Sequence, residues 1–196
     1  LKLFFDGRNR LLPTIRSGGV VNAASGQLGQ GFAPGSYISI FGSGLSDSLQ
    51  VFKTPYLPLS LSNVSVSFDV EARRTSYPGR IHFVSDGQIN VQIPWELEGL
   101  TSCLMKVSIG NIQSALYTVP LNTAGPAAFE YTESSGRLMA AALDEAYRVV
   151  GSANPVERGK VLQLYANGLG PVADPQKSGE AATAISSTRS TPEVTI

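Results

Sequence analysis

The residues best suited to bind a ligand are three amides that share one face of a single expected strand. Gln88, Asn90 and Gln92 alternate with apolar residues, and the strand ends next to Trp95. Because successive side chains of a strand point to opposite faces, the amides form one polar row beside an indole ring. Amides hydrogen-bond sugar hydroxyls and aromatic rings stack on sugar faces, so a glycan is the candidate ligand. The alternative is a solvated or interdomain polar face with Trp95 capping the core.

Catalytic chemistry has only one histidine to use, His82. It falls between Ile81 and Phe83 in an expected strand, and no Gly-x-Ser-x-Gly elbow accompanies it, so we expect an outward-facing polar residue and not a general base. The pair Gly42 and Gly44 lacks the Lys-Ser/Thr of a phosphate-binding loop, and a turn of positive φ explains both glycines. The sequence therefore predicts no catalytic residue and no enzyme.

Metal-ligand spacings are also missing from the sequence, which contains no Cys-x-x-Cys, His-x-x-x-His or calcium loop. Four carboxylates could meet at one end of a sandwich and hold calcium, but solvated loop positions are the simpler interpretation for Asp47, Asp69, Glu71 and Asp86. We expect no metal and no cofactor.

Composition favours an all-β fold. The chain has 42% hydrophobic residues, enough for a core, but only 15% charged residues and 20 glycines, which suit short strands and tight turns. Its 15 basic and 15 acidic residues cancel, so no field attracts nucleic acid or an anionic membrane surface, and no apolar run is long enough for membrane insertion. The single cysteine, Cys103, is expected to be a small buried hydrophobe.

The elements that must position the amide row form an immunoglobulin-like β-sandwich over residues 33–122. About seven short alternating runs occur there, separated by turn residues such as Pro78-Gly79 and Asp86-Gly87. Residues 1–32 are predicted to be a hairpin, closed at Asp6-Gly7, and a linker from an upstream region. Residues 123–155 are predicted to be a linking hairpin, in which residues 138–143 favour strand over helix.

An internal repeat indicates a second sandwich. Residues 35–45 align with residues 159–169, so that Gly35 corresponds to Gly159 and Leu45 to Leu169, and the large apolar residues between them stay in step. Residues 63–66 align with residues 193–196. Residues 156–196 therefore read as the start of a second Ig-like sandwich that is truncated inside a strand, and we expect its exposed strands to pair with the first domain, with another part of the chain or with another copy.

Several stretches together resemble one family, the Solibacter uncharacterised C-terminal domain of exported acidobacterial proteins. They span residues 19–196 and comprise residues 19–25, 33–45, 86–97, 153–159 and 165–171. The two copies also resemble IPT/TIG modules, which have an immunoglobulin fold. The resemblance implies an accessory or structural module without assigned activity, in which the second copy continues beyond Ile196.

The sequence and this resemblance predict a non-catalytic structural, adhesive or spacer module of a larger secreted or cell-surface protein. The expected partners are other domains of the same protein, with self-association through unpaired strands of residues 156–196 and a glycan as further candidates. The alternatives are a carbohydrate-binding module that uses the 88–95 strand and an accessory tail of an extracellular enzyme.

Overall fold

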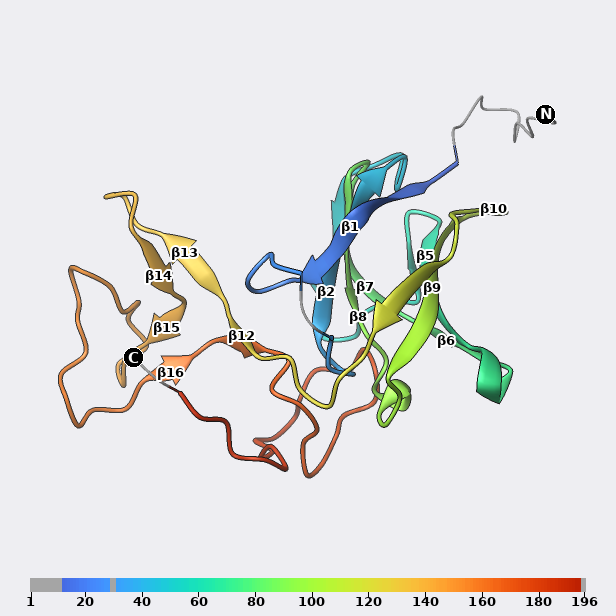
Figure 1. Ribbon diagram of the computed structural model, residues 1–196. Coiled ribbons are helices and arrows are strands. Elements are labelled where there is room, and N and C mark those ends of the chain that lie inside the picture. Colours follow the sequence, from blue (N-terminus) through green and yellow to red (C-terminus); the bar gives the residue numbers. More distant parts are fainter. Residues whose placement is uncertain (1–11, 29–30, 195–196) are drawn as a thin grey trace.

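The computed structural model describes residues 12–28 and 31–194. It confirms the all-β class, with 43% strand, 3% helix and several antiparallel sheets. Two stacked sheets form a β-sandwich, and the rest of the chain, residues 123–194, forms smaller sheets beside and below it (Figure 1). We call residues 123–194 the C-terminal segment. No helix in the described part of the chain is long and apolar enough to cross a membrane.

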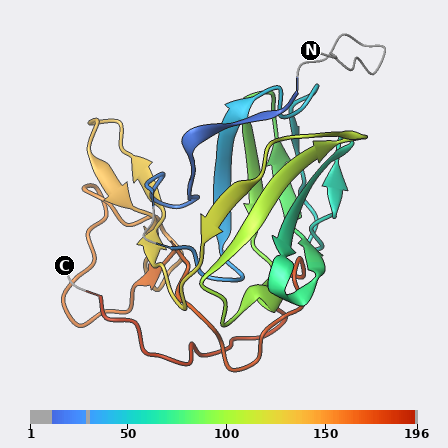
Figure 2. The same ribbon diagram turned by 45° about the vertical axis from the view of Figure 1, so that its right-hand side comes forward.

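The first sheet of the sandwich has the strand order β1-β2-β8-β7-β3, and all of its neighbours pair antiparallel. Its strands are β1 (Thr14–Asn22), β2 (Tyr37–Ser43), β8 (Gln88–Gln92), β7 (Arg80–Val84) and β3 (Gln50–Val51). The second sheet centres on β5 and β9, and Figure 2 shows it facing the first. Its strands are β4 (Ser60–Leu61), β5 (Val64–Val70), β6 (Thr75–Pro78), β9 (Ser102–Ile109), β10 (Ile112–Gln113) and β11 (Tyr117–Pro120). Two short 3-10 helices, η1 (Glu71–Arg73) and η2 (Trp95–Leu97), follow β5 and β8.

Strand β1 corrects the boundary that the sequence places at residue 33. Residues 14–22 are not a linker, because they pair antiparallel with β2 and form an edge of the first sheet. The pairing register shifts between Ile15 and Val20, where Gly18 and Gly19 interrupt the hydrophobic pattern. This irregularity hides the strand from a search for alternating residues. The expected turn at Asp6-Gly7 lies outside the described residues.

The sandwich core follows the alternation of the sequence. Strands β5 and β9 bury every second residue, which gives Cys103 the buried position expected for it. Burial first, and then the negative charge of Asp69, raises the pKa of the Cys103 thiol to about 12. The alternation of the sequence predicts a core that includes Ile38, Ile40, Val66, Ile89, Val91, Val107 and Trp95, and all of these except Trp95 are buried. Trp95 is partly exposed, and Leu97 of η2 enters the core instead.

Truncation of Val91 to alanine is expected to reduce the free energy of unfolding by about 1 to 3 kcal/mol. The side chain is fully buried between Ile38 on β2 and Ile81 on β7, so that the shorter residue leaves a cavity that the strands cannot close. Urea titration of the two proteins measures the difference. A loss indistinguishable from zero would show that this face of β8 does not pack in the core.

The C-terminal segment confirms the expected hairpin and its strand conformation. Strand β13 (Glu130–Thr132) pairs antiparallel with β14 (Leu138–Ala140) around the turn at Gly136. The alanine-rich run continues as β15 (Ala142–Leu143), which is extended and not helical. Residues 123–155 therefore contribute strands to the small sheets at the left of Figure 1.

The strand of the second repeat copy is paired within the chain. Strand β16 (Gln163–Leu164) pairs with β15, and β17 (Ala166–Asn167) pairs with β12 (Ala127–Ala128). Among the described residues these are two-stranded sheets, so the opposite edge of β16 and β17 has no strand beside it. Residues 193–194, which align with the start of β5, are not in a strand, and residues 195–196 lie outside the described part. The second sandwich thus stays a prediction.

Candidate functional site

The amide row lies on the outer face of the first sheet, as the alternation predicts. Ile89 and Val91 are fully buried, whereas Gln88 and Asn90 are half-buried on the other side of β8. The amides bind neighbours on this face: Gln88 Nε2 donates to Asn90 Oδ1 at 2.8 Å, and Ser39 Oγ on β2 donates to the same oxygen at 2.9 Å. These bonds hold Gln88 and Asn90 in a network within the sheet.

Gln92 has a different role, because another part of the chain covers it. Its Nε2 donates to the Gly35 carbonyl at 3.2 Å, and its Oε1 accepts the backbone N–H of Gly179 at 2.7 Å. Residues 178–181, which we call the docked loop, come from the C-terminal segment and are also hydrogen-bonded to residues 55–57. The Gln92 side chain is therefore a buried attachment point for this loop and not an open sugar-binding amide.

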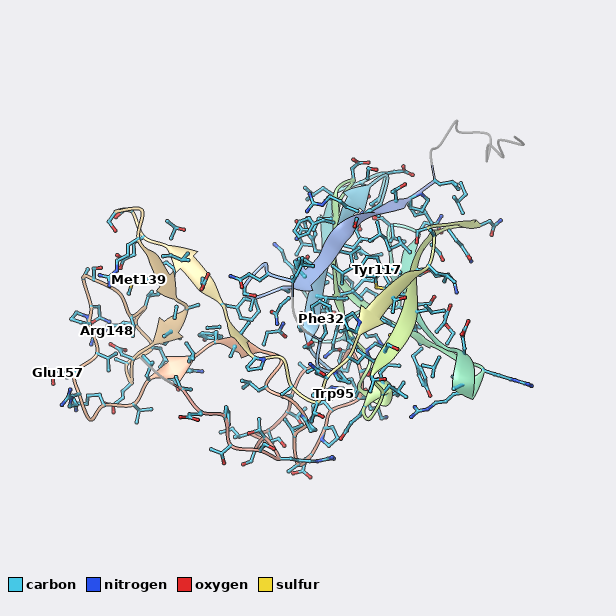
Figure 3. The ribbon with its side chains drawn as sticks, viewed as in Figure 1. Phe32, Trp95, Tyr117, Met139, Arg148 and Glu157 are labelled. Carbon is cyan, nitrogen blue, oxygen red and sulfur yellow. The ribbon has the colours of Figure 1, made fainter. Side chains whose placement is uncertain are left out.

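Trp95 lies at the lower end of the sandwich, next to the red C-terminal chain (Figure 3). Its backbone N–H donates to Ser178 Oγ at 2.9 Å, and that hydroxyl donates to Glu96 Oε2 at 2.6 Å. The indole ring lies over Gly35, where a Cβ atom would come within 2.2 Å of the ring. Trp95 thus packs on the backbone that leads into β2, beside the docked loop.

A shallow pocket of about 270 Å3 opens on the outer face of the sheet, beside the docked loop. Tyr37 and His82 line the pocket with aromatic rings, whose centroids lie 6.4 Å apart in an edge-to-face arrangement. Lys53 and Glu180, which carry opposite charges, also line it. Burial raises the pKa of the Tyr37 hydroxyl, so this ring stays neutral at physiological pH. The pocket offers an aromatic surface with polar groups around it.

A second attachment point joins the C-terminal segment to the edge of the first sheet. Asn167 on β17 mimics a strand partner for Tyr37: its Oδ1 accepts the Tyr37 N–H at 2.9 Å and its Nδ2 donates to the Tyr37 carbonyl at 2.8 Å. The same Nδ2 donates to Asn22 Oδ1 at 2.9 Å, and Asn22 Nδ2 donates to the Gly125 carbonyl at 3.1 Å. Both asparagines are buried. We call Asn22 and Asn167 the asparagine clasp.

The four carboxylates considered for calcium do not form a metal site. Among the described residues no group of three or more His, Cys, Asp or Glu side chains is close enough to hold an ion. Asp69 is instead bonded on the outer face of the second sheet, to the Lys106 ammonium and to Ser76 Oγ.

The Asp69 pair predicts a pH dependence of stability. Burial alone would raise the pKa of the Asp69 carboxyl, but the hydrogen bonds from Lys106 and Ser76 and the charge of Lys106 outweigh it, so that the pKa lies below its ordinary value of 3.8. The stabilisation is therefore present above this ordinary pKa, which applies to the unfolded state, and is lost as the pH falls through the lower folded-state pKa. Urea titrations between neutral and acidic pH should show a shallower acid loss in Asp69→Asn. An unchanged acid slope in this variant would show that the pair contributes nothing.

The residues that sequence reasoning missed are those that attach distant parts of the chain to one another. Asn167, Ser178 and Gly179 bond to residues that are 82 to 145 positions away. The sequence offers one local signal for these residues, the Asn167-Gly168 pair in the second repeat copy, and the repeat already explains that pair as a turn. Tyr37 contributes to both the pocket and the clasp, whereas the repeat over residues 35–45 predicts only that it lies in a strand.

Comparison with protein-family models finds no matching family, and comparison with curated proteins finds no similar protein.

Proposed function

We propose that this chain is a non-catalytic structural spacer of a larger secreted or cell-surface protein, in which the C-terminal segment is fixed to the sandwich as one rigid body. The observation that supports the proposal is the double attachment: the asparagine clasp at β1 and β2, and the docked loop at Gln92 and Trp95. Two separate attachments prevent rotation about either one. Neutral net charge fits a module that holds other domains apart without attracting charged ligands.

The course of the chain also suits a spacer. The blue beginning of the described chain and its dark red end emerge on opposite sides of the molecule in both Figure 1 and Figure 2. Force applied to the two ends would then act across the clasp and the docked loop, because these bonds join the two parts. The Arg189–Glu98 ion pair at 2.8 Å adds a third, exposed contact, and exposed pairs contribute little.

Single-molecule stretching tests the spacer role. With handles outside residues 12 and 194, the chain should lose both parts in one extension step, because the C-terminal segment is bonded to the sandwich at two places. Two steps in the unaltered chain, with the smaller one at low force, would contradict the proposal. The variant Ser178→Ala, which removes the two hydrogen bonds of this hydroxyl to Trp95 and Glu96, should lower the unfolding force, whereas Ser134→Ala in the exposed hairpin turn should not.

A second candidate function, carbohydrate binding, is supported by the pocket of Tyr37 and His82 near the amide row. Here Tyr37 would stack on a sugar ring, while Lys53 and Glu180 would bind its hydroxyls. A glycan array tests the idea. Retention of a glycan that is lost in both His82→Ala and Trp95→Ala would support binding over the 88–95 strand, and loss in His82→Ala alone would restrict binding to the pocket. No retention by the unaltered chain would remove this candidate.

A further inference from the structure

Strands β15 and β16 repeat the pairing of β1 and β2 in the same register. Val20 on β1 lies opposite Ile40 on β2, and Ala142 on β15 lies opposite Leu164 on β16. The repeat aligns Leu164 with Ile40, and the pairing then makes Ala142 on β15 the counterpart of Val20 on β1.

The correspondence continues at the far end of the strand. Thr14 lies opposite Ser43 on β2, and Ala127 on β12 lies opposite Asn167, which the repeat aligns with Ser43. Between these pairs β1 has its irregular stretch, and the second copy has the β13–β14 hairpin at the same place. Strands β12 and β15 are therefore together the equivalent of β1.

The turns that follow these strands are built alike. Asn22 ends β1 and its Oδ1 accepts the backbone N–H of Ala24 at 2.9 Å; Asp144 follows β15 and its Oδ1 accepts the N–H of Ala146 at 2.9 Å. Hydrogen bonds lower the pKa of Asp144 to about 2. The backbone N–H of Arg148 contributes most, the Asn154 and Arg148 side chains contribute less, and burial acts in the opposite direction. The same side-chain turn at equivalent positions makes chance similarity of the two strand pairs a poor explanation.

The two copies differ at the opposite strand edge. In the first copy β2 pairs on that side with β8, and the Gly42 N–H donates to the Gly87 carbonyl. In the second copy no strand of the described residues occupies this edge of β16. The Tyr165 N–H donates to Ala141, on the β15 side, so the alternation of an antiparallel strand directs the backbone groups of Leu164 to the empty edge.

The side chains along this edge are exposed, unlike their counterparts. Val161, Leu162 and Tyr165 are 67%, 39% and 45% exposed. Ile38 and Ile40, the counterparts of Leu162 and Leu164, are 0% exposed under β8 and the facing sheet. An open edge with apolar side chains is a template for strand addition.

We infer that the free edge of β16 and β17 binds an antiparallel strand with the chemistry of β8. Such a strand places apolar residues opposite Leu162 and Leu164, as Val91 and Ile89 lie opposite Ile38 and Ile40. A small amide or hydroxyl residue lies opposite Gln163, as Asn90 lies opposite Ser39 and accepts its hydroxyl hydrogen bond. The register of the first copy thus specifies the direction, pairing and residue types of the partner.

A labelled synthetic peptide with the sequence of residues 86–95 tests the inference by fluorescence anisotropy with the full chain. Saturable binding is expected, and it should weaken by roughly tenfold or more when Ile89 and Val91 of the peptide are both changed to serine. The variant Leu164→Pro removes the N–H that points to the free edge while leaving the bonds to β15, and should weaken binding similarly. Circular dichroism checks that this variant stays folded.

Disulfide trapping tests the register independently of affinity. Residues 39 and 90 form a non-hydrogen-bonded pair, in which the two residues lie closer than in the other antiparallel geometry. Because Gln163 corresponds to Ser39, Gln163→Cys in the chain should form a disulfide with the peptide carrying Asn90→Cys. Cys103 is buried and does not compete. The peptide carrying Gln88→Cys should react much more slowly. Three results would overturn the inference: equal trapping of both peptides, absence of binding, or self-association of the chain through this edge in place of peptide binding. None of them would affect the spacer proposal.

Discussion

Replacing Asn167 by aspartate is expected to separate the C-terminal segment from the sandwich and to lower the free energy of unfolding by about 3 to 5 kcal/mol. The Asn167 amide nitrogen donates to the Tyr37 carbonyl and to Asn22 Oδ1. A carboxylate cannot donate to either oxygen, and it leaves a negative charge at a site that is only 6% exposed. Urea titration gives the loss of stability. Hydrogen exchange gives its location, with faster exchange of the Tyr37 amide and of β12, β15 and β16.

The matched control is Asn111→Asp, the same chemical change at an exposed turn of the sandwich. It should alter stability by less than about 0.5 kcal/mol. Part of the loss in Asn167→Asp should be recovered at acidic pH, where the carboxyl is protonated and can donate one hydrogen bond. Equal stability of the two variants would show that the asparagine clasp does not hold the segment.

The second large effect is expected from Gly42→Ala, which should cost about 3 kcal/mol or more. A Cβ atom on Gly42 would lie 1.9 Å from the Thr14 carbonyl oxygen of the paired strand. The neighbour is backbone and cannot rotate away, so the methyl group must displace β1 from β2. Tryptophan fluorescence during urea unfolding measures the stability, and faster hydrogen exchange of residues 14–22 would locate the change.

Gly87→Ala provides the control for this substitution, because it lies next to Gly42 but its added Cβ would meet only one atom, at 3.9 Å. It should cost less than about 1 kcal/mol. The result also tests the reason for the glycine. The sequence predicts a positive φ at both Gly42 and Gly44, whereas only Gly44 has one, at 63°, and Gly42 is required by the close approach of β1. A loss of equal size in the two variants would contradict this explanation.

Alternation in the sequence predicts the strands that are buried on one face. Strands β2, β5, β8 and β9 each place apolar residues at every second position, because one face meets the core and the other does not. Strand β1 escapes such prediction because Arg16, Ser17 and two glycines interrupt its pattern. Its place in the sheet depends on pairing with β2, a property of two segments and not of one.

The candidate site illustrates the same limit at the level of side chains. Strand geometry predicts that Gln88, Asn90 and Gln92 point to the outer face of the sheet, and in β8 they do so. No local sequence pattern predicts that the Gly179 N–H donates to Gln92, because the two residues are 87 positions apart. Local pattern therefore predicts which face a polar side chain occupies, while long-range docking decides whether that side chain stays available to a ligand.

The most direct test of the central claim, that the C-terminal segment is fixed to the sandwich, is a distance distribution between two spin labels. Labels at Asn111 in the sandwich and Ser134 in the β13–β14 turn both occupy exposed positions, and a Cys103→Val background leaves no other thiol. Rigid attachment predicts one narrow distribution that does not change with temperature below the unfolding transition and that broadens in Asn167→Asp. A broad distribution in the unaltered chain, or one that Asn167→Asp leaves unchanged, would contradict the account.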